Sequence, residues 1–145
     1  VRFAGAMREH GVKPELEIFD AGMVANALWL ERKGYVASPL HFDFVLGVPG
    51  ALPASLKNLL HLVESIPPTA TWSVAGIGRH QLPMAAAALL LGGHARVGLE
   101  DNIYYRAGEP AEGNAPLVER VVRLARELGR EVAAPDEARR ILGLG

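Results

Sequence analysis

Short apolar runs and helical apolar spacings alternate along the chain, and this pattern predicts four strand–helix units. In each unit an apolar run ends in polar residues or glycine, and a stretch with apolar residues at helical spacing follows. The predicted strands are residues 16–19, 41–47, 71–75 and 95–99. The predicted helices are residues 23–33, 54–65, 83–91 and 116–128.

The predicted helices have apolar faces that should pack on the sheet. These faces consist of Met23, Ala27 and Leu30 in the first helix, Leu56, Leu59, Leu60 and Val63 in the second, and Leu117, Val121, Leu124 and Leu128 in the fourth. Asn114 is expected to cap the fourth helix. Residues 2–9 resemble the end of a helix closed by Gly11, and residues 132–143 form a strand–turn–helix tail with Pro135 at the start of its helix.

The alternation of strands and helices indicates a parallel sheet with crossover helices. Two architectures satisfy it, a doubly wound sheet and a (β/α) barrel. The run Gly76-Ile77-Gly78-Arg79-His80-Gln81 begins like a dinucleotide-binding turn, but Gln81 replaces its third glycine. Four units are half of an eight-unit barrel, and the chain opens inside a helix. We therefore expect an α/β fold in which residues 1–145 form a single partial domain, the C-terminal half of a TIM (β/α)8 barrel whose N-terminal half is missing.

Composition excludes several functional classes. Of 145 residues, 50% are hydrophobic and 21% are charged, which predicts a globular domain with a sizeable core. The net charge of −1 gives no reason to expect nucleic acid or an anionic membrane as a partner. The absence of cysteine removes disulfides, thiolate metal sites and cysteine nucleophiles. No signal peptide or membrane-spanning stretch is recognisable, so a cytoplasmic location is expected.

Candidate reactive groups cluster where the predicted strands end, which is where barrel enzymes place their chemistry. These clusters are Glu17 with Asp20, the stretch after Leu46, Arg79 with His80, and Glu100-Asp101-Asn102. Strand alternation would place Arg96, Gly98 and Glu100 on one face. If that face is the barrel interior, a guanidinium and a carboxylate converge at its mouth.

Each cluster also has a simpler explanation. Glu-Asp-Asn after a strand is typical of loop and helix-cap hydrogen bonding, and Arg96 could be a structural partner of Glu100. His80 could be a loop hydrogen-bonding residue. The chain contains neither H-x-H nor H-E-x-x-H, so it cannot by itself complete a histidine-based metal site. It also lacks the G-x-S-x-G of a hydrolase nucleophile.

Five segments in order resemble the C-terminal half of the beta-keto acid cleavage enzymes. The best-known type in that family is the 3-keto-5-aminohexanoate cleavage enzyme of lysine fermentation. The segments are EIFDAGM at 17–23, FVLGV at 44–48, WSVAGIGRHQ at 72–81, RVGLEDN at 96–102 and VVRLARELGREVAAP at 121–135. The resemblance covers nearly the whole chain, and its GxGRHQ and VGLEDN stretches are specific in combination.

The resemblance implies a zinc-dependent (β/α)8 barrel that reacts a β-keto acid with acetyl-CoA to give acetoacetate and a new acyl-CoA. Glu100 would match the zinc ligand of the GLED motif, while the family's two histidine ligands belong to an H-x-H that this chain lacks. Asp101 and Arg96 would match the pair that takes a proton from the keto acid. Glu17 would match a carboxylate near the substrate.

Physical chemistry adds expectations to these roles. Arg96 should orient Asp101 and hold the pKa of its carboxyl low. Arg79 and His80, at the barrel mouth, are expected to contact CoA or a substrate carboxylate, because arginine suits such anions.

Two other functions stay open at this point. One is another metal-dependent carbon–carbon lyase of the aldolase type, which acetyl-CoA dependence would distinguish. The other is a non-catalytic half-barrel that assembles with a partner or with itself. Family members are commonly oligomeric, and a half-barrel has open strand edges, so a homo-oligomer is expected.

Overall fold

Four parallel strands form one sheet in the computed structural model, which describes residues 1–144. The strands are β1 (Leu16–Ile18), β2 (His41–Leu46), β3 (Thr71–Gly76) and β4 (His94–Arg96). Their order in the sheet is β1-β2-β3-β4, the same as their order in the chain. The predicted parallel α/β architecture is therefore confirmed, and every strand is joined to the next by a helix, as such pairing requires.

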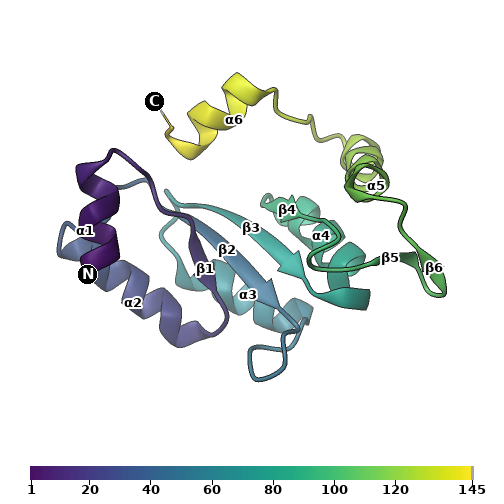
Figure 1. The fold of residues 1–145 in the computed structure, drawn as a ribbon, viewed down its shortest axis with the longest axis horizontal. Coiled ribbons are helices and arrows are strands. Elements are labelled where there is room, and N and C mark those ends of the chain that lie inside the picture. The colour runs from purple at the N-terminus through teal and green to yellow at the C-terminus, as the bar shows by residue number, and fades with distance from the viewer. Residues whose placement is uncertain (145) are drawn as a thin grey trace.

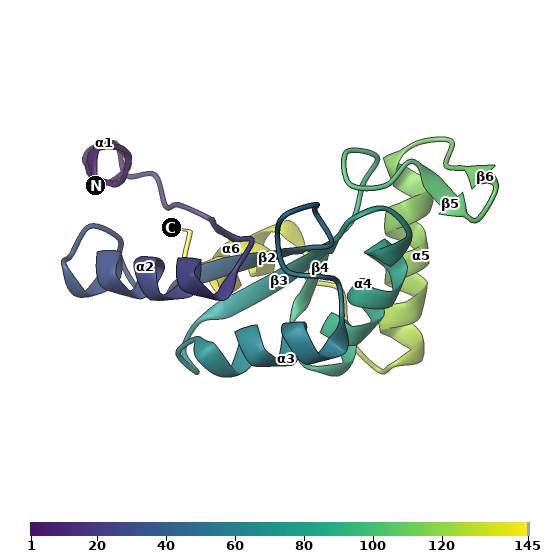
Figure 2. The ribbon, with the colours of Figure 1, turned by 90° about the horizontal axis from the view of Figure 1, so that it is seen from below.

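Six α-helices accompany the sheet within residues 1–144. They are α1 (Arg2–Glu9), α2 (Ala21–Arg32), α3 (Leu56–Ser65), α4 (Gln81–Leu90), α5 (Asn114–Glu127) and α6 (Pro135–Leu142), with a 3-10 turn η1 at Gly78–His80. Figure 2 shows α2 and α3 along one side of the sheet. In Figure 1, α5 lies at the opposite end of the molecule from α1. Within residues 1–144, no helix is both long enough and apolar enough to cross a membrane.

The two faces of the sheet differ in chemistry. The face that packs against the helices is apolar, and the rings of Phe44 and Trp72 lie 5.7 Å apart in its core. The opposite face carries polar side chains at alternate positions, including Asp43 on β2 and Ser73 on β3. Because β2 is buried on both faces, its polar residues must satisfy their hydrogen bonds inside the protein.

The predicted helix faces are correct in part. In α2 the buried residues are Val24 and Ala27, whereas Met23 is exposed. In α3 they are Leu59 and Leu62, whereas Leu56 is 63% exposed and Leu60 is also exposed. In α5 they are Leu117 and Ala125, whereas Leu128 is exposed. These helices have apolar residues on more than one stripe, so only packing on the sheet decides which stripe is buried.

The region after β4 also differs from prediction. β4 ends at Arg96 rather than at residue 99, because residues 98–101 turn. The predicted loop contains a hairpin of β5 (Tyr104–Arg106) and β6 (Glu109–Pro110). Asn114 is the first residue of α5 rather than its cap, and its Oδ1 accepts a hydrogen bond of 2.8 Å from the Leu99 amide.

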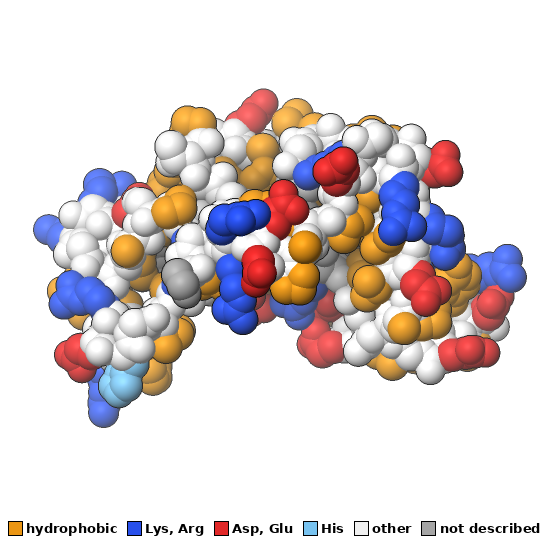
Figure 3. Space-filling model, turned by 90° about the horizontal axis from the view of Figure 1, so that it is seen from above, with side chains coloured by type: hydrophobic (Ala, Val, Ile, Leu, Met, Phe, Trp, Pro, Cys, Tyr) orange, Lys and Arg blue, Asp and Glu red, His pale blue; other side chains and the backbone are white. Residues whose placement is uncertain are grey.

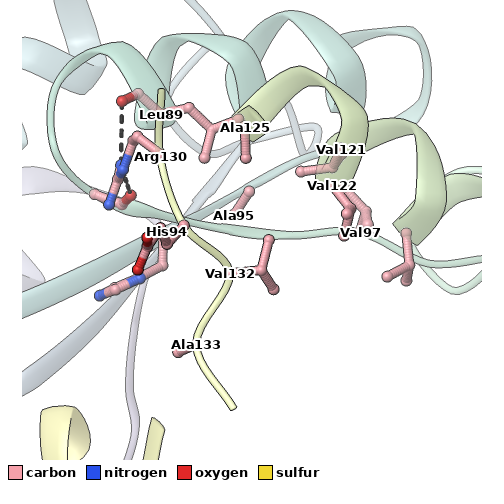
Figure 4. Close-up of a pocket in the computed structure, with 13 residues that line it drawn as sticks. Leu89, His94, Ala95, Val97, Val121, Val122, Ala125, Arg130, Val132 and Ala133 are labelled. Carbon is pink, nitrogen blue, oxygen red and sulfur yellow. Dashed lines mark hydrogen bonds between the residues drawn. The ribbon is translucent and has the colours of Figure 1, made fainter. Parts of the chain in front are cut away.

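The tail returns along β4 to the amino ends of the strands. Residues 132–134 do not form the predicted strand, whereas α6 begins at Pro135 as predicted. A pocket of about 290 Å³ lies between β4, α5 and this tail (Figure 4). Beside it, Arg130 donates to the carbonyl oxygens of Leu89 and Gly93 at 3.1 and 2.6 Å. Lys13, just before β1, donates to the Leu142 carbonyl and so ties α6 to the amino end of the sheet.

One face of the molecule shows the balanced charge of the sequence. In the view of Figure 3, positive and negative side chains are interspersed with apolar ones, and neither sign forms a continuous field. This face therefore offers no broad electrostatic surface for a polyanion.

Candidate active site

The strand register places polar side chains at one height across three strands. Glu17 of β1 is paired in register with Asp43 of β2, and Asp43 is paired with Ser73 of β3. Arg96 is paired with Ala75, two residues beyond Ser73 and closer to the carboxyl ends of the strands. Arg96 therefore lies above the layer formed by Glu17, Asp43 and Ser73.

The Arg96 guanidinium of β4 joins four carboxylates, which come from two other strands and from the turn after β4. Its Nη1 lies 2.7 Å from Glu17 Oε1 and 3.0 Å from Asp43 Oδ2. Its Nη2 lies 2.8 Å from Glu100 Oε2 and 3.1 Å from Asp101 Oδ1, and its Nε donates to the other Asp101 oxygen at 3.2 Å. The structure thus brings together four of the residues that the sequence identified, namely Glu17, Arg96, Glu100 and Asp101.

These carboxylates differ sharply in exposure. The side chains of Asp43 and Asp101 are 0% and 4% exposed, whereas those of Glu17 and Glu100 are 47% and 81% exposed. One guanidinium therefore pairs with two buried carboxylates and also contacts two at the surface. The arrangement leaves excess negative charge facing solvent, where a cation or a proton can be bound.

The pKa of Asp101 is raised, not lowered as the sequence led us to expect. Burial first, and then the hydrogen bond with Glu100, raise the pKa of Asp101 to about 6 against the opposing charge of Arg96. The pKa of Glu100 is lowered, first by that hydrogen bond with Asp101 and then by the one from Arg96. Burial alone would lower the pKa of Arg96, but its hydrogen bonds to Glu17 and Asp43 and the Asp101 charge raise it overall. Arg96 therefore stays charged, and the pKa of Asp101 lies closer to neutrality than that of an ordinary aspartate.

Glu100 reaches Arg96 by a turn and not by the predicted strand alternation. The chain leaves β4 at Arg96, and the Asn102 amide donates to the Gly98 carbonyl at 3.1 Å, which closes the turn. Gln81 supports the turn by donating to the same carbonyl at 2.9 Å. Asp101 is thereby turned inward while its neighbour Glu100 stays at the surface.

Sequence reasoning missed Asp43 and Ser73. The Ser73 hydroxyl donates to Asp43 Oδ1 at 2.6 Å, so both oxygens of this buried carboxylate are hydrogen-bonded. The available signal was a lone carboxylate inside the apolar strand HFDFVL. Such a residue needs a cationic partner, and only the fold could identify that partner as Arg96, which is 53 residues away.

Arg79 and His80 lie beside the cluster and not within it. The Gly78 amide of η1 donates to the Asp101 carbonyl at 2.7 Å, which joins η1 to the turn. Arg79 is exposed, and its Nε donates to Nε2 of His80 at 3.4 Å. Asp20 is not part of the site either, because its side chain accepts from the Met23 amide and caps α2.

Of the two exposed carboxylates in the cluster, Glu100 is the more accessible ligand for a cation. Glu100 is the acidic residue most accessible at the mouth, but no group of three or more His, Cys, Asp or Glu among the described residues could hold a metal ion. The donor set of this chain therefore fits one position of a metal site and does not complete it.

Comparison with known proteins identifies relatives along nearly the whole chain. The family model of the beta-keto acid cleavage enzymes matches residues 1–144. A 3-keto-5-aminohexanoate cleavage enzyme of Fusobacterium nucleatum is 56% identical over 142 residues, which are 98% of this chain and 52% of that protein. The enzyme of the same name from Acetoanaerobium sticklandii is 50% identical over 144 residues, covering 99% of this chain and 53% of that protein.

A further relative bears a name that includes acetyl-CoA. The 3-oxoadipate:acetyl-CoA acetyltransferase of Cupriavidus necator is 42% identical over 144 residues, which cover 97% of this chain and 51% of that protein. The chain therefore spans about half the length of the relatives it matches.

Proposed function

The chain belongs to the beta-keto acid cleavage enzyme family, and on that premise we propose that it contributes to an acyltransferase acting on a β-keto acid and acetyl-CoA. The products would be acetoacetate and a new acyl-CoA. The observation that supports this most directly is the Arg96 cluster, in which a buried Asp101 with a raised pKa adjoins an exposed Glu100.

We further propose that the chain is one half of a (β/α)8 barrel. Among residues 1–144, β1 and β4 are the edges of the sheet, and each has a strand on one side only. Four further β/α units would pair with both edges and close the barrel. The polar face with Asp43 and Ser73 would then form the barrel interior, and the Arg96 cluster would lie at its catalytic end.

Asp101 is the proposed general base. A carboxyl whose pKa is about 6 is mostly ionised at neutral pH and still accepts protons readily. Its role is to remove a proton from the carbon between the keto and carboxylate groups of the substrate. Arg96 contacts both Asp101 oxygens and so orients the carboxylate for that transfer.

The resulting carbanion attacks the acetyl carbonyl carbon of acetyl-CoA, a carbon–carbon bond forms, and the CoA thiolate leaves. The thiolate then attacks the original keto carbon, and the bond from that carbon to the carboxylate-bearing carbon breaks. These steps release an acyl-CoA and the carbanion of acetoacetate. Asp101 returns the proton to that carbanion, which balances the reaction.

Glu100 is proposed as one ligand of a zinc ion whose remaining ligands lie outside this chain. When bound, zinc would act as a Lewis acid toward the keto and carboxylate oxygens. Glu17 at the cluster rim is proposed to contact the keto acid, and its side chain is half exposed. Arg79 and His80 are proposed to contact CoA or a substrate carboxylate.

The test uses the protein that contains this chain, alongside its Glu100→Gln variant. Zinc content and acetyl-CoA-dependent formation of acetoacetate are measured across a panel of β-keto acids. We expect the parent to hold zinc and turn over at least one keto acid, and Glu100→Gln to lose both properties. The panel then identifies the substrate.

Two outcomes would overturn the proposal. Cleavage of a keto acid without any need for acetyl-CoA would favour a metal-dependent carbon–carbon lyase of the aldolase type. A folded, metal-free protein with no turnover would favour a non-catalytic module whose role is assembly.

A further inference from the structure

A second cavity lies next to the Arg96 cluster, on the other side of the turn. This pocket of about 470 Å³ opens between the start of α4 and the β5–β6 hairpin, with α5 behind it. Gly78 and Asn102 line it, and both adjoin Asp101: Gly78 donates to the Asp101 carbonyl, and Asn102 follows Asp101 in the chain. The pocket therefore adjoins the backbone of the residue that carries the proposed base.

The pocket is cationic in a protein that has no excess of positive charge. Its lining includes the three arginines Arg79, Arg106 and Arg120 and no carboxylate. Across the turn, the Arg96 cluster has four carboxylates around one guanidinium. The two sides of the turn therefore have opposite charge, and the pocket would attract an anion.

One hydrogen-bond donor of Arg120 has no acceptor in the described part of the chain. Its guanidinium carbon lies 4.4 Å from the centre of the Tyr105 ring, and one terminal nitrogen donates to the Tyr105 carbonyl. Its Nε is buried and has no hydrogen-bond partner within residues 1–144. A buried charged donor without a partner is costly, and the Arg120 side chain that carries it also lines the pocket.

The rest of the lining suits a flat aromatic group. Tyr104 and Tyr105 come from the hairpin, and Leu82 and Pro83 from the start of α4. Aromatic and apolar side chains together with arginines are the combination that binds a nucleobase and its phosphates. Arg79 is part of this lining, whereas its neighbour His80 is not, so only Arg79 is placed to contact a ligand in the pocket.

We propose that this pocket, between the Tyr104–Gly108 hairpin and the start of α4, binds the phosphorylated adenosine end of acetyl-CoA. The thioester end would then pass Asn102 to reach Asp101. This assignment rests on the proposed use of acetyl-CoA, and it names the part of the protein that recognises that co-substrate.

The test compares acetyl-CoA with S-acetylpantetheine, which has the thioester but no nucleotide. The variants are Arg120→Met and Arg106→Ala; Arg106 is exposed and paired with Glu109 at the surface, so its removal does not threaten folding. We expect each variant to raise KM for acetyl-CoA about tenfold, the effect of losing one charge-assisted hydrogen bond, with kcat within about twofold. For S-acetylpantetheine, KM should not change.

Arg123→Met is the matched control. Arg123 also comes from α5 and donates to the Tyr105 hydroxyl at 3.1 Å, but it does not line the pocket. If Arg120 only anchors the hairpin, each of the variants Arg120→Met and Arg123→Met should change KM for acetyl-CoA and KM for S-acetylpantetheine by the same factor. That result would show that the assignment is wrong.

Direct binding separates this assignment from the proposed reaction. Calorimetry with adenosine 3′,5′-bisphosphate should show binding that Arg120→Met and Arg106→Ala weaken and Arg123→Met leaves intact. Such binding without turnover of any keto acid would support the pocket and contradict the reaction. Turnover with acetyl-CoA, combined with no binding of the bisphosphate and equal KM values in all variants, would contradict the pocket and support the reaction.

Discussion

The polar face of the sheet buries titratable side chains at both of its ends, and the two ends stabilise them in different ways. At the carboxyl end, four carboxylates share the one guanidinium of Arg96, and two of them extend to solvent. At the amino end, the buried titratable group is the imidazole of His41. Its Nδ1 is joined to Oγ1 of Thr71 by a hydrogen bond of 2.8 Å, and its Nε2 lies 3.4 Å from Glu15.

The pKa shifts follow this difference. Burial lowers the pKa of His41, so its neutral form is favoured, and burial likewise lowers the pKa of the neighbouring His94. At the carboxyl end, burial raises the pKa of Asp101 to about 6 beside a guanidinium that stays charged. The amino end therefore suppresses charge and serves stability, whereas the carboxyl end retains charge that a substrate or a cation can use.

Replacing Arg96 should have the largest effect. Arg96→Met would leave the buried Asp43 carboxylate without its cation, which costs about 3–5 kcal/mol, and we expect the lower end because the Arg96 side chain is 35% exposed. Activity should be lost as well, since Asp101 loses its orienting partner. Urea unfolding and the acyl-transfer assay measure both effects. A stable Arg96→Met protein would show that Asp43 is satisfied by Ser73 alone.

Replacing one carboxylate at a time should identify the base. Asp101→Asn is expected to lower kcat about 10²–10⁴-fold, the usual contribution of a general base, with little loss of stability. Asp43→Asn is the matched variant, because it removes a carboxylate from the same guanidinium on the buried side. If Asp43→Asn lowers kcat more than Asp101→Asn in folded protein, the base has been assigned to the wrong residue.

Two glycines allow a matched comparison: Gly76 is the last residue of β3, and Gly93 directly precedes β4. A Cβ on Gly76 would overlap the His80 carbonyl and displace η1, whereas one on Gly93 would overlap the Trp72 ring far from the site. Each Gly→Ala change should destabilise by about 1–3 kcal/mol, as overpacking does. Only Gly76→Ala should also change KM. Equal KM values in the two variants would argue against a role for η1 in binding.

The smallest expected effect concerns pH and the amino end. The pKa of His41 is lower in the folded protein, so between its folded and unfolded values the unfolded chain binds more protons, and stability falls as pH falls below about 6.5. The His41→Gln variant removes this titration, and the amide side chain that it introduces can still hydrogen-bond Thr71. The loss of unfolding free energy between pH 7 and pH 5.5 should therefore be smaller in His41→Gln than in the parent. An identical loss would assign the acid sensitivity to other groups.

Local patterns were sufficient to predict most of the elements. The buried strand β2, the breaks at glycine and proline, and the start of α6 at Pro135 follow from periodicity and backbone restriction. The β5–β6 hairpin was missed because Tyr104–Pro110 alternates weakly and the segment is largely exposed. Arg96, Glu100 and Asp101 were identified together because they lie within six residues of one another.

The sequence alone determined the α/β class, the parallel sheet that follows from four consecutive β/α units, and the chemical types gathered where strands end. The tertiary structure alone decided which charges meet. Glu17, Asp43 and Arg96 come from three strands, and the register that aligns them depends on the packing of the whole sheet. It also decided the direction in which the pKa of Asp101 shifts, because burial outweighs the nearby guanidinium, and burial is a property of the folded chain and of no local pattern.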